Sequence, residues 1–365
     1  RSFFMRGDNM IRATLLGVLF VLSGQVSAEA ETTAVVDANS DDAAAVFKTI
    51  SAALESAPRA AAGPYRILIR KGVYREKLVI TRPDVHLLGE DRHGVVISWD
   101  DTGSTLGPDG RELGTAGSAT LTISAPGFRA ENLTVENSFD YAANLALPEN
   151  DPGKVRRMQA VALMTTGDSD KSIFESVTIR GFQDTLFANT GRHWFHNCRV
   201  EGHVDFIFGA GQAVFDRCEI VSRNRKNKNP TGYVTAPSTH IAHPYGMLFI
   251  NSRFLKDSPE VPAASVRLGR PWHPNGSPLA EGSAVFINCF MDNHIGPEGY
   301  APISAVGPDG VRKWFKVDDR SRFFEQGSYG PGAIVSKQRP QLSPEVAEWY
   351  TAEQVLNGWN PASER

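Results

Sequence analysis

The sequence is poor in cysteine, nearly neutral in charge, and without long hydrophobic runs after its N-terminal segment. Only 3 of its 365 residues are Cys, and no CxxC or HxxxH spacing occurs, so we expect neither a metal site nor a cofactor. The 38 basic and 41 acidic residues give a net charge of −3, which provides no general attraction to nucleic acid. No later stretch is long enough to span a bilayer, so we expect no membrane contact once the N-terminal segment is removed.

Residues 1–28 have the pattern of a secretory signal peptide. Two arginines precede the apolar run Ala13–Leu22, and Val26–Ala28 offers small residues at a cleavage site. The run is shorter than the roughly 20 residues that span a bilayer, which favours a cleaved leader over a membrane anchor. We therefore expect one domain over residues 29–365 in a secreted protein. It would be extracellular or, in a Gram-negative bacterium, periplasmic or on the outer surface.

A phrase built on Phe recurs along the chain with a period near 21 residues. A Phe is followed by one or two polar residues and a β-prone tetrad, as in "FESVTI" and "FHNCRV". A unit of this length cannot bury its own apolar face, so successive units must stack. The last five copies are separated by 21, 20, 34 and 37 residues, and the copies begin at Phe128, Phe174, Phe195, Phe215, Phe249 and Phe286.

This repeat predicts an all-β parallel β-helix. Short strands rich in Val, Ile and Phe, joined by Gly and Asn turns, suit such a solenoid. A β-propeller is the alternative, but its blades need about 40 residues and four antiparallel strands each. The apolar spacing over Asp42–Pro58 predicts a helix that caps the open end, and Ser343–Leu356 predicts helix in a C-terminal tail.

The cysteines provide a test of the stacking. Cys198 and Cys218 hold the same slot in successive units, where a parallel sheet places equivalent residues about 4.8 Å apart. A disulfide tolerates this separation and a secreted chain would oxidise such a pair, so we expect a Cys198–Cys218 disulfide. Two buried, unbonded thiols are the alternative. Cys289 holds the same slot, but Ser252 occupies it in the unit between, so Cys289 is expected to be a free, buried thiol.

Two similar phrases, "GFQDTLF" and "GHVDFIFG", each place an Asp three residues after a Gly. Asp184 and Asp205 are 21 residues apart, one turn of the solenoid, and we expect them about 5 Å apart on neighbouring strands. Two carboxylates so close in an apolar setting cannot both ionise cheaply, so one should keep its proton. The pair then offers an acid and an anionic nucleophile or base. Two structural aspartates that cap turns are the alternative.

The surrounding residues favour a hydrolytic site. Gln183 and Gln159 are amide donors that could stabilise an oxyanion. Arg270 in "LGRPW" could clamp one carboxylate and keep it ionised. Trp272 offers a flat surface for a sugar ring. Together these residues describe a nucleophile, an acid, oxyanion donors and a platform.

At this point the ordered motifs "QAVAL", "GFQDTLF", "GHVDFIFG" and "LGRPW" closely resemble those of the pectin methylesterases, or pectinesterases, a family of right-handed parallel β-helices. The likeness continues in "FKTISAAL" and "SRFFEQGSYGPGA" and covers nearly all of the chain after the leader. It implies a bacterial-type enzyme without an inhibitory pro-domain that hydrolyses methyl esters of galacturonate in pectin, giving pectate and methanol.

The resemblance also implies a role for each motif residue. Asp205 would be the nucleophile that forms an acyl-enzyme, and Asp184 the general acid and then base. Gln159 and Gln183 would donate to the oxyanion, and Arg270 would orient Asp205. Contacts to pectin would come from Trp272, Phe208, Thr115, Arg225 and Tyr233.

The segment Asn293–Gly310 does not match the family pattern. The resemblance therefore implies no pectin contacts for this segment. Pectin is the expected partner, and we expect a monomer.

A polygalacturonase-like glycoside hydrolase is a second hypothesis, because paired carboxylates also cleave glycosidic bonds. A separation of about 5 Å suits retaining cleavage, however, whereas that β-helix family is inverting. A non-catalytic carbohydrate-binding solenoid is the third hypothesis.

Overall fold

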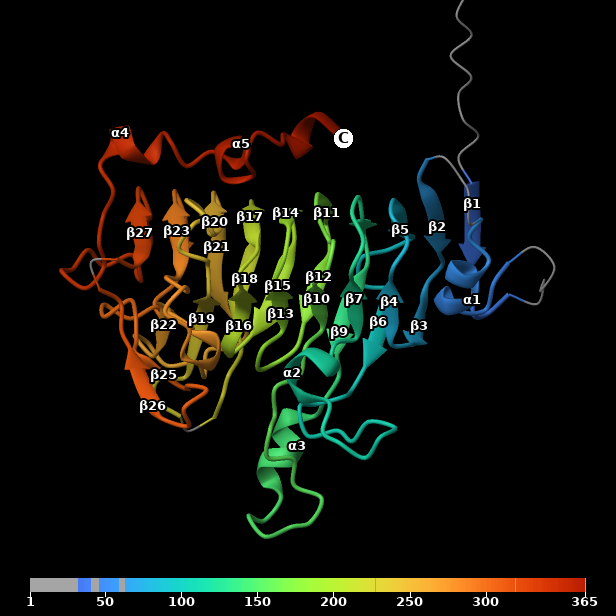
Figure 1. Cartoon of the computed structure of the whole chain (residues 1–365), viewed down its shortest axis with the longest axis horizontal. Helices are drawn as coiled ribbons and strands as arrows, with labels where there is room; N and C mark the ends of the chain where they lie inside the picture. The colour runs from blue at the N-terminus through green and yellow to red at the C-terminus, as the bar shows by residue number, and fades with distance from the viewer. Residues whose placement is uncertain (1–31, 41–45, 59–62, 227, 319, 365) are drawn as a thin grey trace, which may run out of the picture. The chain divides into compact units, whose positions relative to one another are not determined.

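Parallel strands form the frame of the structure, a computed structural model that describes residues 32–40, 46–58, 63–226, 228–318 and 320–364 (Figure 1). All of the described residues belong to one compact unit. The predicted signal peptide, residues 1–28, lies outside the described residues.

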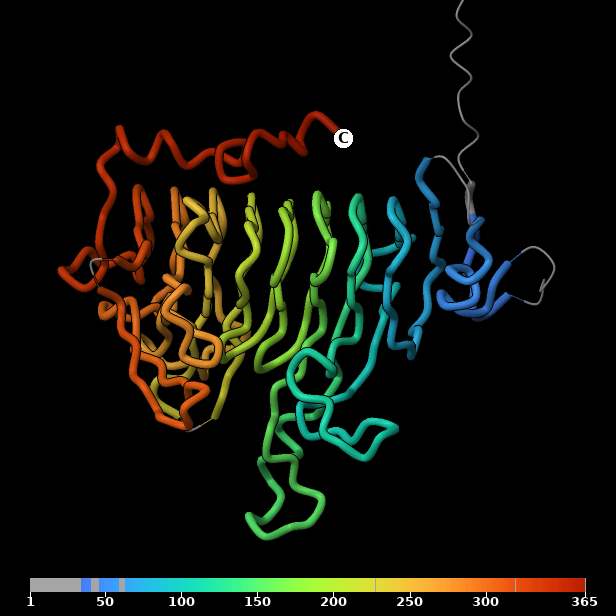
Figure 2. Tube along the Cα trace, viewed as in Figure 1, coloured from blue at the N-terminus to red at the C-terminus, as the bar shows by residue number. Residues whose placement is uncertain are grey.

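Three parallel sheets, named A, B and C here, contain nearly all of the described strands, and each full turn of the chain passes through them in that order (Figure 2). Sheet A consists of β1 (Thr32–Val36), β2 (Tyr65–Ile69), β5 (Val85–Gly89), β8 (Arg129–Glu131), β11 (Ser172–Glu175), β14 (Arg192–His196), β17 (Gln212–Asp216), β20 (Met247–Ile250), β23 (Ser283–Ile287) and β27 (Arg322–Gln326). Sheet B consists of β3 (Gly72–Arg75), β6 (Val95–Trp99), β9 (Thr134–Asn137), β12 (Thr178–Arg180), β15 (Arg199–Gly202), β18 (Glu219–Ser222), β21 (Arg253–Lys256) and β24 (Phe290–Met291). Sheet C consists of β4 (Leu78–Ile80), β7 (Leu121–Ile123), β10 (Leu163–Thr165), β13 (Leu186–Ala188), β16 (Val204–Gly209), β19 (Gly232–Pro237) and β22 (Val266–Gly269). The predicted right-handed parallel β-helix is confirmed.

The repeated Phe residues form a ladder of stacked rings inside the helix. From Phe174 to Phe286, neighbouring ring centroids lie 4.5, 4.7, 4.6 and 5.0 Å apart, and the rings are nearly parallel. Phe128 does not belong to this ladder, because Ala130 is the residue that pairs with Phe174. The ring of Phe128 meets that of Phe174 at 47° instead. The 21-residue period therefore stacks equivalent side chains directly on one another.

The polar residue before the Cys slot in each repeat forms the turn between sheets A and B. Its backbone is left-handed, a conformation that Asn adopts more readily than most residues. This preference explains why Asn recurs at this point of the repeat. The φ angles are 50–54° at Asn132, Ser176, Asn197, Arg217, Asn251 and Asn288.

The helices are short. α1 (Ile50–Glu55) lies against β1 at the N-terminal end of the solenoid, where a capping helix was predicted, but it is shorter than the predicted 42–58 (Figure 1). The helix predicted over Ser343–Leu356 is two separate helices, α4 (Pro344–Ala347) and α5 (Ala352–Val355). None of the described helices is long and apolar enough to cross a membrane. The other helices are α2 (Gly114–Gly117), α3 (Tyr141–Ala146), η1 (Pro274–Gly276) and η2 (Pro361–Glu364).

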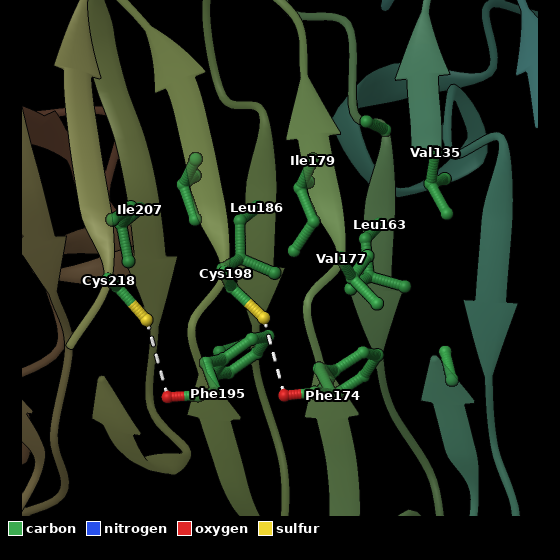
Figure 3. Packing of buried hydrophobic residues seen from close by; sticks show 14 of the residues in the cluster. Val135, Leu163, Phe174, Val177, Ile179, Leu186, Phe195, Cys198, Ile207 and Cys218 are labelled. Atoms are coloured by element: carbon green, nitrogen blue, oxygen red, sulfur yellow. Dashed lines mark hydrogen bonds between the residues drawn. The ribbon is translucent and has the colours of Figure 1, made fainter. Parts of the chain in front are cut away.

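The predicted Cys198–Cys218 disulfide is wrong. Both residues are free and buried, and so is Cys289, as predicted. Side chains at equivalent positions of stacked turns point the same way. The Cβ–Sγ bonds of Cys198 and Cys218 therefore run in the same direction, and neither Sγ atom points toward the other (Figure 3). The Sγ of Cys198 instead lies 3.3 Å from the carbonyl oxygen of Phe174, and that of Cys218 lies 3.3 Å from the carbonyl oxygen of Phe195. The alternative of buried, unbonded thiols therefore holds.

Candidate active site

A cleft lies over the outer face of sheet C, between inserts that leave the solenoid on two sides. Thr115 on α2 contributes to one wall, and the antiparallel hairpin of β25 (Ile303–Val306) and β26 (Arg312–Phe315) builds the other. The cavity between them has a volume of about 470 Å³. Every residue predicted for the site except Arg225 lines this cavity.

Asp184 and Asp205 occupy equivalent positions on successive turns. Gln183 pairs with Val204 in the parallel ladder, and the backbone N–H of Asp184 donates to the carbonyl oxygen of Val204 at 3.0 Å. β13 and β16 then continue with the same offset. Each aspartate is only 9% exposed, and both line the cavity. The structure thus brings together the two carboxylates that the spacing predicted.

Both aspartates have an uncommon backbone conformation. The φ angle is 61° at Asp184 and 49° at Asp205, in the left-handed region that residues with a Cβ rarely adopt. The register of β16 against β19 also shifts between Val204 and Ile207, so the ladder is irregular over the two residues that include Asp205. Bulges and strained backbone are typical of functional sites, because they redirect a side chain away from the regular pleat.

Gly202, in the second phrase, has no room for a side chain. A Cβ at this position would lie 2.3 Å from the Cβ of Phe206 and 2.7 Å from the carbonyl oxygen of Phe182. The chain can therefore pack against the preceding turn only without a side chain here.

Asp184 is the carboxyl group whose pKa is raised. Burial raises its pKa well above the ordinary aspartate value, and the negative charge of Asp205 raises this pKa further. The charge of Arg270 and a hydrogen bond with Gln183 act in the opposite direction, but they are the smaller effects. Asp184 is therefore suited to donate a proton near neutral pH.

Arg270 clamps Asp205 with two parallel hydrogen bonds. Its Nε donates to Oδ1 of Asp205 at 2.6 Å, and its Nη2 donates to Oδ2 at 2.5 Å. The guanidinium group lies over the ring of Tyr233, 4.0 Å from its centroid. A bidentate pair of this kind fixes the orientation of the carboxylate. Arg270 thus distinguishes the two acids, because these two bonds go to Asp205 alone.

Gln159 and Gln183 lie next to each other beside the two carboxyl groups. They are paired in the parallel ladder of sheet C, and both line the cavity. The Oε1 atom of Gln159 is buried and has no hydrogen-bond partner among the described residues. Two neighbouring amide groups can direct N–H donors toward an oxygen that becomes negatively charged.

Apolar side chains on the outer face of sheet C form the floor of the cleft. The rings of Phe187 and Phe208 stack with centroids 4.1 Å apart. Trp272 meets both rings edge-on, at 6.1 and 5.6 Å. An aromatic surface beside a polar site suits a sugar chain, whose ring faces are largely apolar.

Comparisons with known proteins agree with this geometry. The Pectinesterase family model matches residues 34–307. The chain belongs to the pectinesterase family. Pectinesterase A of Dickeya dadantii (strain 3937) is 46% identical over 364 residues, covering 96% of this chain and 98% of the relative. A pectin methylesterase solved in complex with a hexasaccharide has a TM-score of 0.86 at 47% identity, covering 90% of this chain and 98% of that structure. The pectin methylesterase from Yersinia enterocolitica has a TM-score of 0.82 at 45% identity, covering 86% and 99%.

As a pectinesterase, the protein is a carboxylic ester hydrolase, and its reaction is the hydrolysis of pectin methyl esters. This activity takes the place of the glycoside hydrolase and non-catalytic hypotheses. The match to a bacterial relative over nearly the whole chain fits the predicted bacterial type.

Arg225 is the one predicted contact of this pectinesterase that does not line the cleft. It lies near His203, whose pKa is lowered well below the ordinary histidine value by burial and then by the charges of Arg225 and Arg223. A contact between Arg225 and pectin therefore stays a prediction.

Sequence reasoning missed several residues of the pectinesterase cleft. Phe187 could have been found, because it aligns with Phe208 at the repeat offset. Ala236 lies on β19, where it pairs with Phe208. The others lie in or beside the hairpin, outside the repeat, where no periodic signal exists. The missed residues are Phe187, Ala236, Pro302, Ile303, Ser304 and Trp314.

Proposed function

We propose that this pectinesterase cleaves the methyl ester through a covalent intermediate on Asp205. A carboxylate oxygen of Asp205 attacks the carbonyl carbon of an esterified galacturonate unit, and the carbonyl oxygen becomes a tetrahedral oxyanion. The single observation that carries this proposal is the bidentate pair with Arg270, because it holds both carboxylate oxygens of Asp205 in one orientation.

Asp184 supplies the proton for the leaving group. The bond between the carbonyl carbon and the methoxy oxygen breaks, and methanol departs with the Asp184 proton. Water then attacks the acyl carbon and gives a proton to the Asp184 carboxylate, and the bond to Asp205 breaks. The product is a galacturonate carboxyl group, and both aspartates return to their starting forms. The raised pKa of Asp184 supports this role.

Gln159 and Gln183 stabilise the oxyanion in both steps. A backbone bridge holds the two residues side by side, so both amide groups start from the edge of the cleft where the charge develops. This role gives a reason for the two glutamine side chains at this place. A turn with a purely structural role would need neither of them.

Pectin lies along the cleft and contacts Trp272, Phe208, Thr115 and Tyr233, and Arg225 attracts its free carboxylates. The relative solved with a hexasaccharide supports binding of a pectin chain at this site. The protein acts as a monomer after secretion, outside the cytoplasm, where pectin is found.

Methanol release from highly methylated pectin tests this function. The expected result is methanol and new carboxyl groups in equal amounts, without an increase in reducing ends. Reducing ends without methanol would overturn the proposal in favour of a glycoside hydrolase.

A further inference from the structure

The hairpin of β25 and β26 carries a tryptophan that the chemistry above does not use. Trp314 is 69% exposed, yet it lines the cleft together with Ser304. An exposed indole that lines a cleft offers an apolar face to a bound ligand. Trp314 is directly opposite Ser304 in the antiparallel ladder, so both side chains lie on one face of the hairpin.

Arg312 lies on the same face of the hairpin. Alternation along β26 places it on the side of Trp314, and its Nη1 donates to the Oγ of Ser304 at 2.8 Å. Among the described residues it has no acidic partner within salt-bridge distance. Lys313 points to the opposite face and pairs with Asp309 at 3.5 Å. The cleft side of the hairpin thus presents an aromatic ring next to an unneutralised cation.

The hairpin is fixed to the catalytic segment. The ring of Phe315 stacks on that of His273, with centroids 3.8 Å apart and an angle of 9° between the rings. His273 is buried and directly follows Trp272. β25 also lies against η1, which begins at the next residue. Trp314 is therefore held in a defined position relative to Arg270.

We propose that Trp314 and Arg312 form an outer subsite for a galacturonate unit that is already de-esterified. This inference rests on the proposed function. Trp314 stacks on the sugar ring, and Arg312 pairs with the free carboxylate of the same unit or its neighbour. A guanidinium group binds a carboxylate with two hydrogen bonds and a full charge, whereas a methyl ester offers no charge to pair. This subsite should therefore bind a free carboxylate more tightly than a methyl ester.

The contribution of the ring can be measured with Trp314→Ala and Trp314→Phe. An aromatic contact of roughly 0.5–1.5 kcal/mol corresponds to an increase in KM for pectin of about three- to tenfold, at nearly constant kcat. Trp314→Phe keeps a ring and should lie between the wild type and Trp314→Ala. Trp349→Ala is the control, because this residue is 67% exposed but lies in the C-terminal tail. An unchanged KM for Trp314→Ala would overturn the role of the ring.

The contribution of the cation can be measured with Arg312→Gln against Lys313→Gln, which removes the same charge from the opposite face. On partly de-esterified pectin at low ionic strength, we expect KM to rise about fivefold for Arg312→Gln only, the size of roughly 1 kcal/mol for an exposed charge pair. On fully methylated pectin the rise should be less than about twofold, and salt should reduce it on both substrates. Equal effects of Arg312→Gln on both substrates, or of both variants, would refute the subsite. Such a result would say nothing against methanol release by the wild type. Failure of the subsite can therefore be told apart from failure of the proposed function.

Discussion

At the scale of single residues, the two aspartates differ because their partners differ. Asp205 has Arg270 on both carboxylate oxygens, whereas Asp184 is buried beside the negative charge of Asp205. The same residue type therefore takes two roles, set by burial and by the position of one guanidinium group.

The raised pKa of Asp184 predicts a cost in stability. The folded chain holds this proton to a higher pH than the unfolded chain does, so the free energy of unfolding falls as pH rises above the ordinary aspartate pKa. Asp184→Asn removes this cost and should raise Tm at pH 7 by about 2–4 °C, the shift that roughly 1 kcal/mol produces in a protein of a few hundred residues. At about pH 3.5, below the ordinary pKa, the difference should vanish. Scanning calorimetry at both pH values measures this, and a variant that is less stable at pH 7 would contradict it.

Arg270 should control both turnover and its pH dependence. Arg270→Ala leaves the carboxylate pair without its cation, so the pair gains a proton at higher pH and the acidic limb of the kcat/KM profile moves upward. Turnover should fall roughly 10²-fold, because the nucleophile loses its orientation. Arg270→Lys keeps the charge but not the bidentate geometry, and its acidic limb should stay near that of the wild type. An unchanged profile for Arg270→Ala would show that the clamp has no role.

The repeat made the pair of aspartates in the cleft predictable, but it could not predict the cleft wall formed by the hairpin of β25 and β26. Asp184 and Asp205 were found because a fixed offset brings equivalent residues together. Trp314 lies in an insert, where side-chain position depends on the hairpin and on the stacking of Phe315 on His273. No periodic pattern encodes such long-range contacts, and the same limit applies to Arg225.

At the scale of elements, the Phe ladder is a buried contact that runs through successive turns. Its rings are buried and the inner ones stack on both sides, so each inner ring contributes its burial and two aromatic contacts. The period of the repeat was visible in the sequence for this reason. The disulfide was predicted wrongly because the same stacking keeps equivalent side chains parallel.

Phe215→Ala should interrupt the ladder at its centre. Loss of a buried Phe leaves a cavity that costs about 3–5 kcal/mol. Denaturant unfolding followed by circular dichroism measures the change. Val79→Ala is the control, because Val79 is exposed on β4 and should change stability by no more than about 0.5 kcal/mol. A loss below about 1 kcal/mol for Phe215→Ala would contradict the role of the ladder.

The C-terminal tail contains helix, as predicted. Ser343 and Thr351 each accept a hydrogen bond as an N-cap and begin separate short helices. Both caps were present in the sequence. Their effect depends on the tail lying flat along the solenoid, which the sequence does not reveal.

At the scale of the whole molecule, the C-terminal tail runs back across the outer face of sheet A (Figure 1). Trp359, Val355 and Leu356 pack against side chains from several successive turns, and Arg192 donates to the carbonyl oxygen of Leu356 at 3.2 Å. The tail therefore links turns that otherwise contact only their neighbours. It lies on a different sheet from the cleft.

Trp359→Ala should lower stability without changing the reaction. The side chain is 5% exposed, and removing a buried Trp costs about 3–5 kcal/mol. Thermal unfolding should show a lower Tm, while kcat for methanol release below the unfolding range stays at the wild-type value. Trp349→Ala, an exposed position of the same tail, should leave both unchanged. A large fall in kcat for the folded Trp359→Ala protein would contradict the separation of tail and site.

The division of roles between the two aspartates is tested most directly by kcat for methanol release with Asp205→Asn, alongside binding of a pectin oligosaccharide to the same variant. Asparagine keeps an oxygen that can accept a hydrogen bond from Arg270 but cannot form the acyl-enzyme. The account predicts a loss of at least about 10⁴-fold in kcat, as removal of a nucleophile produces in other hydrolases, with binding within about threefold of the wild type. Turnover within about tenfold of the wild type, with the substitution verified by mass spectrometry, would contradict it.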